Sequence, residues 1–408
     1  MKLYFEAYGC TMNQGESKLM QRWSAQAGHE IVNRPDDADM IIFSGCIVID
    51  HTYRHMMKRL GELKKYGKKM VVSGCLASVF ADKVREMVPD SIILPTWEID
   101  KITDYIGVAG EPKPFRWGVI GVIPIAQGCM GNCTYCITKV ARRNLKSAPH
   151  SWILETAKEM ISSGVKEIEL TAQDSAVYGI DTGHSLPELM RDINAIEGEF
   201  RIRVGMMNPD AASRIMDKLI EAYKLPKVYK FLHLPVQSGD NGVLRDMRRN
   251  YTVEEFKDIV ERFRDEIPEI TISTDIIVGY PTESEEAFMR SLGLIKEIKP
   301  NIVNITRFSP RPFTDAYKLK PITPRIVKER SRKMTALAME ISMEINSGLV
   351  GKRKRVLITE KGKNSTVVGR TDEYVPVVLR HGKIGEFVDV EIEKGEVGYV
   401  VGKEYRKI

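Results

Sequence analysis

Short apolar runs alternate with amphipathic stretches over the first hundred residues. Four runs have the length and composition of buried strands: KLYFEAY, ADMIIFSG, KKMVVSG and SIILP. The stretches between them, including 16–27 and 77–88, have a helical spacing of apolar positions. Strands that alternate with helices are typical of a parallel α/β sheet, which we predict for residues 1–112. The segment GVAGEPKPFRWG at 107–118 concentrates Gly and Pro and is expected to be a linker.

The middle of the chain repeats the strand and helix alternation. Its strand candidates are VIGVIPIA, VKEIELT, FRIRVGMM, VYKFLHLPV, ITISTDIIVG and IVNITRF. Two Thr-x-x-Glu pairs, at 252–255 and 282–285, have the spacing of capping boxes that open helices. Six β/α units rather than eight predict an open, partial barrel over 119–345. Thr323-Pro324 is expected to begin a long helix that runs to about Asn346.

After this helix the pattern changes to short alternating strands with Gly and charged turns, which predicts a small β-barrel over 346–408. This segment carries 13 Lys and Arg against 9 Asp and Glu, so it holds most of the chain's net charge of +6. A basic run opens it: Lys352, Arg353, Lys354 and Arg355. Such a run can contact RNA phosphates without reading sequence, while a strand edge guarded by lysines is the alternative.

Length and composition limit the class of protein. A chain of 408 residues exceeds what one hydrophobic core usually serves, so two or three domains are expected. No stretch approaches the roughly 20 apolar residues that span a bilayer, and the N-terminal apolar run is too short for a signal peptide. We therefore expect a soluble, cytoplasmic protein. Its 6 cysteines are too sparse for a disulfide scaffold.

Three of these cysteines form a CxxxCxxC triplet, Cys129, Cys133 and Cys136, directly after the strand candidate VIGVIPIA. Three thiolates this close on a loop can hold three irons of a four-iron cluster. The fourth iron is then open to a chelating ligand such as the amino and carboxylate groups of S-adenosylmethionine (SAM). The alternative is a structural zinc site, but such sites usually close with a fourth Cys or His, and the next histidine is His150.

The other three cysteines, Cys10, Cys46 and Cys75, each follow a glycine at the end of a predicted strand. Because the carboxyl ends of parallel strands share one edge of a sheet, these distant residues can converge. Glycine lets the backbone approach a bulky ligand. Three converging thiolates indicate a second cluster with another open iron; three unrelated buried cysteines are the alternative.

The CxxxCxxC triplet, with Tyr135 before its last cysteine and a partial barrel after it, resembles the radical SAM superfamily. The resemblance implies that Tyr135 packs near the SAM adenine and that the cluster donates one electron to cleave SAM into methionine and a 5′-deoxyadenosyl radical. The whole chain resembles the methylthiotransferases, with an N-terminal three-cysteine domain, a radical SAM domain and a TRAM domain. The segments LHLPVQSGDNGVLRDMRRNYT, STDIIVGYPTES and RFSPRPFTDA carry this resemblance. YGCTMNQGES is similar to the archaeal and eukaryotic branch, which modifies threonylcarbamoyladenosine next to the tRNA anticodon.

Polar residues at predicted strand ends are candidates for holding SAM, because open strand ends are where a barrel binds its ligands. They are Gln173, Asp174, Asn208, Gln237, Ser238 and Asp275. TAQD stands where the family usually has GGE, which leaves the role of Gln173 open, and Asn and Gln are also common turn formers. Arg307 and Arg311 in RFSPRP are candidate contacts to phosphate or base, with a surface ion pair as the alternative.

Together these features predict a tRNA methylthiotransferase with two [4Fe-4S] clusters and SAM. One SAM would methylate a sulfur on the N-terminal cluster. A second would be cleaved at the other cluster, and the radical would remove hydrogen from adenosine C2. Expected partners are the tRNA anticodon stem-loop, a flavodoxin- or ferredoxin-like electron donor and a sulfur source, and the chain can act as a monomer. Alternatives are methylthiolation of isopentenyladenosine or of a ribosomal-protein aspartate, and an RNA-binding module with a structural metal.

Overall fold

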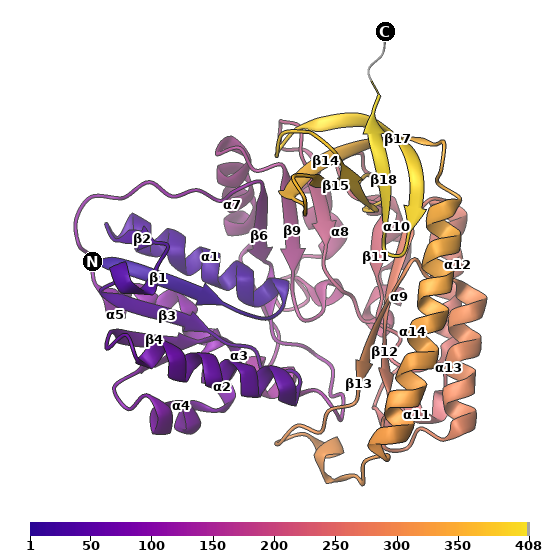
Figure 1. Cartoon of the computed structure of the whole chain (residues 1–408), viewed down its shortest axis with the longest axis horizontal. Coiled ribbons are helices and arrows are strands. Elements are labelled where there is room, and N and C mark those ends of the chain that lie inside the picture. Colours follow the sequence, from indigo (N-terminus) through magenta and orange to yellow (C-terminus); the bar gives the residue numbers. More distant parts are fainter. Residues whose placement is uncertain (406–408) are drawn as a thin grey trace.

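The computed structural model describes residues 1–405 and has three parts (Figure 1). The first part is a five-stranded parallel sheet in the order β2-β1-β3-β4-β5. Its strands are β1 (Lys2–Ala7), β2 (Glu30–Val32), β3 (Met40–Ser44), β4 (Lys69–Ser73) and β5 (Ile92–Leu94). Its helices are α1 (Thr11–Gln26), α2 (Asp50–Lys64), α3 (Gly74–Val79), α4 (Ala81–Met87) and α5 (Ile102–Ile106). The predicted parallel α/β architecture is confirmed.

Two details of this part differ from the sequence-based expectation. The three-residue strand β2 is too short to show a periodic pattern. The helix expected at 77–88 is two helices, because Phe80 leaves helical geometry with φ −117° and ψ 36°.

The second part is an open run of six parallel strands, as predicted. They are β6 (Ile120–Pro124), β9 (Glu167–Thr171), β10 (Arg201–Val204), β11 (Phe231–His233), β12 (Thr271–Val278) and β13 (Ile302–Arg307). Two three-stranded sheets, β10-β9-β6 and β11-β12-β13, meet through a bridge between Ile202 and Val228. The helices of this part include α7 (His150–Ser162), α8 (Leu186–Asn194), α10 (Met216–Tyr223), α12 (Val253–Glu266) and α13 (Glu285–Ile298). Shorter elements are β7 (Ala126–Gln127), α6 (Ile137–Arg142), β8 (Lys146–Ser147), α9 (Pro209–Ser213) and α11 (Asn241–Asp246).

One of the two predicted capping boxes is present. The Thr252 side chain accepts from the Glu255 N–H, and the Glu255 side chain accepts from the Thr252 N–H. The box expected at 282–285 is wrong. Helix α13 begins two residues later, where the Ser284 hydroxyl accepts from the Ala287 N–H at 3.2 Å.

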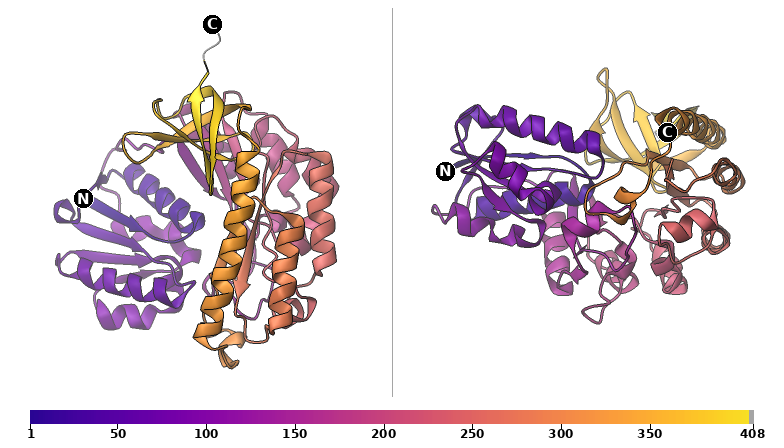
Figure 2. Two further views of the ribbon diagram at one scale, coloured as in Figure 1. Left: turned by 45° about the vertical axis from the view of Figure 1, so that its right-hand side comes forward. Right: turned by 90° about the horizontal axis from the view of Figure 1, so that it is seen from below.

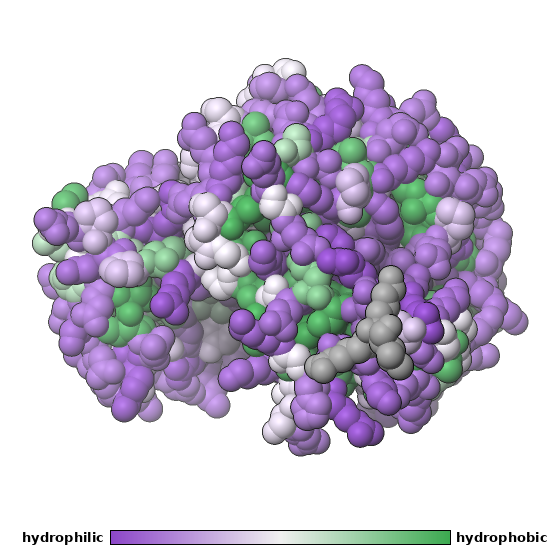
Figure 3. Space-filling model, turned by 90° about the horizontal axis from the view of Figure 1, so that it is seen from above, coloured by the Kyte–Doolittle hydropathy of each residue, from purple (hydrophilic) through white to green (hydrophobic). Residues whose placement is uncertain are grey.

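The third part follows the long helix α14 (Pro324–Ser347), which begins after Thr323 as predicted. It is a closed barrel of β14 (Arg353–Lys361), β15 (Val367–Thr371), β16 (Pro376–Leu379), β17 (Phe387–Glu396) and β18 (Tyr399–Glu404). Figures 1 and 2 show it over the amino ends of the central strands, and ion pairs Arg201–Asp372 and Lys354–Glu269 fix it there. Seen from this end, the surface is mostly hydrophilic with smaller hydrophobic areas (Figure 3). In residues 1–405 no helix is long and apolar enough to cross a membrane.

Candidate active site

The three N-terminal cysteines meet at one edge of the first sheet. Strands β1, β3 and β4 are neighbours, and their last residues are aligned across the sheet: Ala7 with Ser44, and Ser44 with Ser73. Each cysteine follows its strand by two or three positions, so the register itself brings the three loops together. Cys46 and Cys75 are buried, and Cys10 is exposed.

Glycine at position 9 is required by this convergence. Its φ is +115°, and a Cβ there would lie 2.7 Å from the Cβ of Cys46 and 3.2 Å from its Sγ. A larger residue would therefore push Cys10 and Cys46 apart.

Asn13 contacts all three segments that carry the N-terminal cysteines, although the sequence analysis did not select it. Its amide nitrogen donates to the Tyr8 carbonyl at 3.0 Å and to the Gly45 carbonyl at 3.4 Å. Its Oδ1 lies 3.9 Å from Cys75 Sγ. Asn13 is fully buried, so its hydrogen bonds fix the loops without competition from water. Its place three positions after Cys10 in the first turn of α1 was the signal in the sequence.

The second triplet lies on the loop between β7 and α6. Gln173, which follows β9, accepts from the Gly128 N–H at 2.6 Å and so holds the start of the loop. Thr134 at its centre contacts the hydroxyl of Tyr280 at 2.8 Å. Cys136 is at the N-cap position of α6, where its carbonyl accepts from the Lys139 N–H at 3.3 Å. The loop is thus fixed at its beginning, middle and end.

Donors point at the sulfur atoms of this loop. The Gly131 N–H donates to Cys129 Sγ at 3.2 Å, and Arg249 Nη1 donates to Cys133 Sγ at 3.3 Å. Arg249 also donates to Asn208 Oδ1 at 3.0 Å, which links the cysteine loop to the end of β10. Hydrogen bonds to sulfur are a normal feature of iron–sulfur sites. The sequence analysis missed Arg249, whose signal was its place in the quoted segment MRRNYT.

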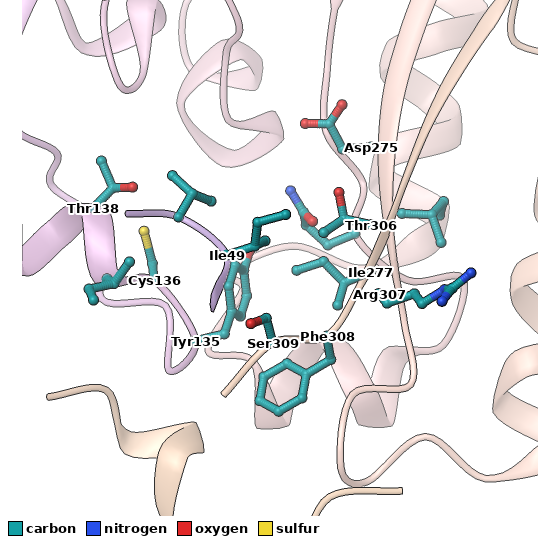
Figure 4. A pocket seen from close by; sticks show the side chains of 14 residues that line it. Ile49, Tyr135, Cys136, Thr138, Asp275, Ile277, Thr306, Arg307, Phe308 and Ser309 are labelled. Carbon is teal, nitrogen blue, oxygen red and sulfur yellow. The ribbon is translucent and has the colours of Figure 1, made fainter. Parts of the chain in front are cut away.

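A cavity of ≈ 180 Å³ is lined by Cys136 of the second triplet together with residues that follow Cys46 in the chain (Figure 4). Val48 and Ile49, just after Cys46, line one part of it. Tyr135 and Cys136 line another. The remainder comes from Gln237 and from residues of β12, β13 and the following loop, including Asp275, Arg307 and Ser309. The residues predicted from separate motifs therefore border one space.

Two further SAM candidates, Asp174 and Asp275, are held by hydrogen bonds within the central barrel. Asp174 is buried; its Oδ1 accepts from the N–H groups of Ala176 at 3.2 Å and Asn208 at 3.1 Å, and burial raises its pKa to about 6. Asp275 lies inside β12 rather than at its end, and its Oδ1 accepts from His233 Nε2 at 2.9 Å.

Ser238 lies outside the cavity. Its hydroxyl is 3.5 Å from that of Ser291 on α13, where it helps to pack the helix.

The two arginines of RFSPRP differ in exposure. Arg307 is exposed at the cavity, and in Figure 4 its guanidinium points away from Cys136. Arg311 is only 2% exposed; it pairs with Asp50 at 3.2 Å and lies over the Tyr53 ring. The ion pair that was the alternative for Arg311 is present, but it is buried rather than on the surface, because the loop folds back onto α2. The contact of Arg311 with RNA stays a prediction.

The basic run at the start of the third part faces the central barrel. Lys354 pairs with Glu269 at 3.0 Å and Glu373 at 2.7 Å, and Arg355 pairs with Glu199. The guanidinium of Arg353 lies 3.8 Å from the centre of the Tyr405 ring, and Lys352 is 3.9 Å from Glu269. Lys352, Lys354 and Arg355 therefore dock the C-terminal barrel onto the strand ends, whereas Arg353 packs within that barrel. The RNA contact of the four residues stays a prediction.

The chemistry of both triplets fits iron–sulfur clusters. Burial raises the pKa of Cys129 to about 11 and that of Cys75 to about 12, so these thiols hold their protons until a metal displaces them. Within residues 1–405 no three His, Cys, Asp or Glu side chains are grouped closely enough to hold a single metal ion. A four-iron cluster instead spreads its ligands over several metal atoms.

Comparison with known proteins first defines the class. The Radical SAM superfamily model matches residues 123–295, and the TRAM domain model matches residues 349–403. A model described as Uncharacterized protein family UPF0004 matches residues 2–94. The chain is therefore a radical SAM enzyme, whose central domain implies a [4Fe-4S] cluster and SAM, with a TRAM domain at its C-terminal end.

Close relatives then define the family. The chain is 44% identical to the probable threonylcarbamoyladenosine tRNA methylthiotransferase of Pyrococcus horikoshii, over 99% of both chains. It is 30% identical to the human threonylcarbamoyladenosine tRNA methylthiotransferase, over 93% of this chain and 69% of the human protein. The chain belongs to the threonylcarbamoyladenosine tRNA methylthiotransferase family.

Among solved structures, the radical S-adenosylmethionine methyltransferase TsrM from Kitasatospora setae is similar with a TM-score of 0.58 at 12% identity, over 87% of this chain and 78% of TsrM. The cobalamin-dependent radical enzyme OxsB is similar with a TM-score of 0.53 at 10% identity, over 83% of this chain and 56% of OxsB. These likenesses show the fold alone.

Proposed function

We propose that this enzyme converts threonylcarbamoyladenosine next to the tRNA anticodon to its 2-methylthio derivative. The observation that carries the proposal is the cavity that residues next to Cys46 share with Cys136. A substrate in that cavity would lie beside Cys136 and beside the segment that follows Cys46, and the transfer of a sulfur-bearing group by a radical route requires such proximity. The names of the archaeal and human relatives support the choice of base.

Two [4Fe-4S] clusters fit the two triplets. Cys129, Cys133 and Cys136 would hold one, and Cys10, Cys46 and Cys75 the other. When bound, the clusters and SAM supply one-electron cleavage of SAM and a site for the transferred sulfur. A reductant of flavodoxin or ferredoxin type supplies the electron, and an external source supplies the sulfur.

The chain's own residues bind and orient the reactants. Arg249, already directed at Cys133 and Asn208, is suited to the SAM carboxylate because a guanidinium forms strong paired hydrogen bonds with carboxylates. Tyr135, Gln237 and Asp275 would contact the remainder of SAM or the base from the walls of the cavity. Gln173 acts indirectly, by holding Gly128 at the start of the cysteine loop.

The tRNA contact of the C-terminal barrel is better assigned to two of its loops than to residues 352–355. These are the turns around 361–363 and 380–383: a Cβ at Gly382 would contact Ile358 and Val367, which belong to the two strands that the first turn joins. Their basic residues are exposed: Lys361, Lys363, Arg380, His381 and Lys383. Exposed cations can bind phosphates.

Three units follow from this assignment: residues 1–112 for the N-terminal cluster, 119–345 for SAM chemistry and 346–408 for RNA. Each contributes to one reaction within a single chain, so we propose a monomer. For an enzyme that modifies tRNA we propose the cytoplasm as the compartment.

The decisive experiment is mass spectrometry of tRNA nucleosides from a strain that lacks the gene. We expect 2-methylthio-threonylcarbamoyladenosine to disappear and to return with the wild-type gene. A variant with Cys10, Cys46 and Cys75 changed to Ala should not restore it, although the purified variant should still cleave SAM. Loss of the isopentenyladenosine derivative instead, or restoration by the triple variant, would overturn the proposal.

A further inference from the structure

One short helix physically connects the two cysteine triplets. Helix α6 has Cys136 as its N-terminal cap and Arg142 as its last residue. Six residues of α-helix span about 9 Å. Ile137 and Ala141 of this helix pack in the same hydrophobic cluster as Cys75. The helix that begins at the SAM-cleaving triplet thus ends inside the N-terminal domain.

Arg142 ends this helix inside the N-terminal cysteine site. It is 1% exposed, and its Nη1 and Nη2 donate to the two carboxylate oxygens of Glu16 at 2.5 and 2.8 Å. Nη2 also donates to Asn13 Oδ1 at 2.6 Å, the same oxygen that lies 3.9 Å from Cys75 Sγ. Its Nε is buried without a hydrogen-bond partner. A cation that is buried with one unused donor beside three cysteines fits an anionic group there.

Glu16 carries the opposite charge, but it does not cancel the positive charge that Arg142 presents to the N-terminal cysteines. Arg142 Nη2 and Cys75 Sγ share one partner, Asn13 Oδ1, at 2.6 and 3.9 Å, whereas the two carboxylate oxygens of Glu16 accept from the guanidinium. The ion pair is therefore oriented with its positive end towards the N-terminal triplet.

We propose that Arg142 is a positioning residue that fixes the two triplets relative to each other and sets the reduction potential of the N-terminal cluster. This rests on the proposed function, in which Cys10, Cys46 and Cys75 hold that cluster. Reduction adds a negative charge to a cluster, and a nearby buried cation stabilises the reduced form and raises the potential. Glu16 opposes this, so removing either partner must move the potential in opposite directions.

The test uses the full chain with Cys129, Cys133 and Cys136 changed to Ala, so that only the N-terminal triplet can be loaded with iron. Into this background go Arg142→Met, Arg142→Lys and Glu16→Gln. The control is Arg22→Met, because Arg22 on α1 also bridges to the central domain, through Glu159 on α7, but away from the cysteines. Redox titration followed by electron paramagnetic resonance reports the midpoint potential, and iron analysis reports loading.

We expect Arg142→Met to raise the ratio of oxidised to reduced cluster about tenfold at a fixed applied potential, which corresponds to a midpoint lower by about 59 mV. Glu16→Gln should change the ratio in the opposite direction, Arg142→Lys should restore most of the wild-type value, and Arg22→Met should match the background.

If Arg142 had a purely structural role, Arg142→Met and Glu16→Gln would shift the midpoint potential in the same direction or leave it unchanged. Either result overturns the inference. If Arg142→Met does not fold, the inference is tested by the directions in which Glu16→Gln and Arg142→Lys shift the midpoint potential. A background protein that binds no iron refutes the proposed cluster, and this inference with it. Normal loading with an unchanged potential refutes only the role of Arg142.

Discussion

Replacement of Glu167 by glutamine tests how the TRAM domain is held on the radical SAM domain. Glu167 lies at the start of β9 and is fully buried. Its carboxylate oxygens accept from the hydroxyls of Tyr374 at 3.1 Å and Tyr229 at 3.2 Å. Burial, with repulsion from Glu169 as the next cause, raises its pKa from 4.5 to about 7. The interface therefore holds a carboxyl group that is protonated over part of the physiological pH range.

The raised pKa sets both the sign and the size of the effect. The native state binds the Glu167 proton more tightly than the unfolded state, so its stabilising contribution is complete below about pH 4.5 and is lost as the pH rises through about 7. At about 1.4 kcal/mol per pH unit, the total change is about 3 kcal/mol. Glutamine cannot ionise, so the Glu167→Gln protein should lack this part of the pH dependence.

The assay is urea unfolding of both proteins at several pH values between 5 and 8. We expect the variant to gain stability relative to wild type as the pH rises, by about 2 kcal/mol over that interval. Glu199→Gln is the control: it removes an exposed ion pair of the same interface and should change stability by less than about 1 kcal/mol. A stability difference between wild type and Glu167→Gln that stays constant with pH would refute the reasoning.

Three further predictions concern the cysteine loops. In the proposed two-cluster enzyme, Gly9→Ala should lower bound iron from about eight to about four atoms per chain, because its Cβ would collide with Cys46; iron analysis checks this. Asn13→Ala should lower the free energy of unfolding in urea by about 2–4 kcal/mol, because two buried backbone carbonyls lose their donor. The control Gln14→Ala, which removes an exposed hydrogen bond, should lower it by less than about 1 kcal/mol. Tyr280→Phe should lower the free energy of unfolding by about 1 kcal/mol and leave bound iron unchanged. A loss of iron would show that the Tyr280 hydroxyl is essential to the loop that carries Cys129, Cys133 and Cys136.

The convergence of Cys10, Cys46 and Cys75 could be predicted from the sequence because it depends on strand order and period alone. Parallel strands that end in Gly-Cys must present their cysteines at one edge, whatever the side chains between them do. The six-stranded open barrel and the terminal β-barrel followed from periodicity in the same way.

Contacts between domains could not be predicted in this way. The partner of Arg142, Glu16, is 126 positions away, and no local pattern signals that pair. For the run at 352–355 the sequence shows the positive charge but not Glu199 and Glu269, which face it across the interface. The capping box at 282–285 failed for a local reason: Ser284, two positions later, is at least as good an N-cap residue and takes that position.

The placement of the TRAM domain limits the kind of substrate that can use the whole enzyme. The domain contacts the amino ends of the central strands, and the cavity lies towards their carboxyl ends. Strand β12 alone has 8 residues, which span about 26 Å at roughly 3.3 Å per residue. A free nucleoside can fill the cavity but cannot reach the basic loops of the C-terminal barrel. Only a polymer that extends past the height of the barrel can contact both, so this architecture favours modification of adenosine within a folded RNA.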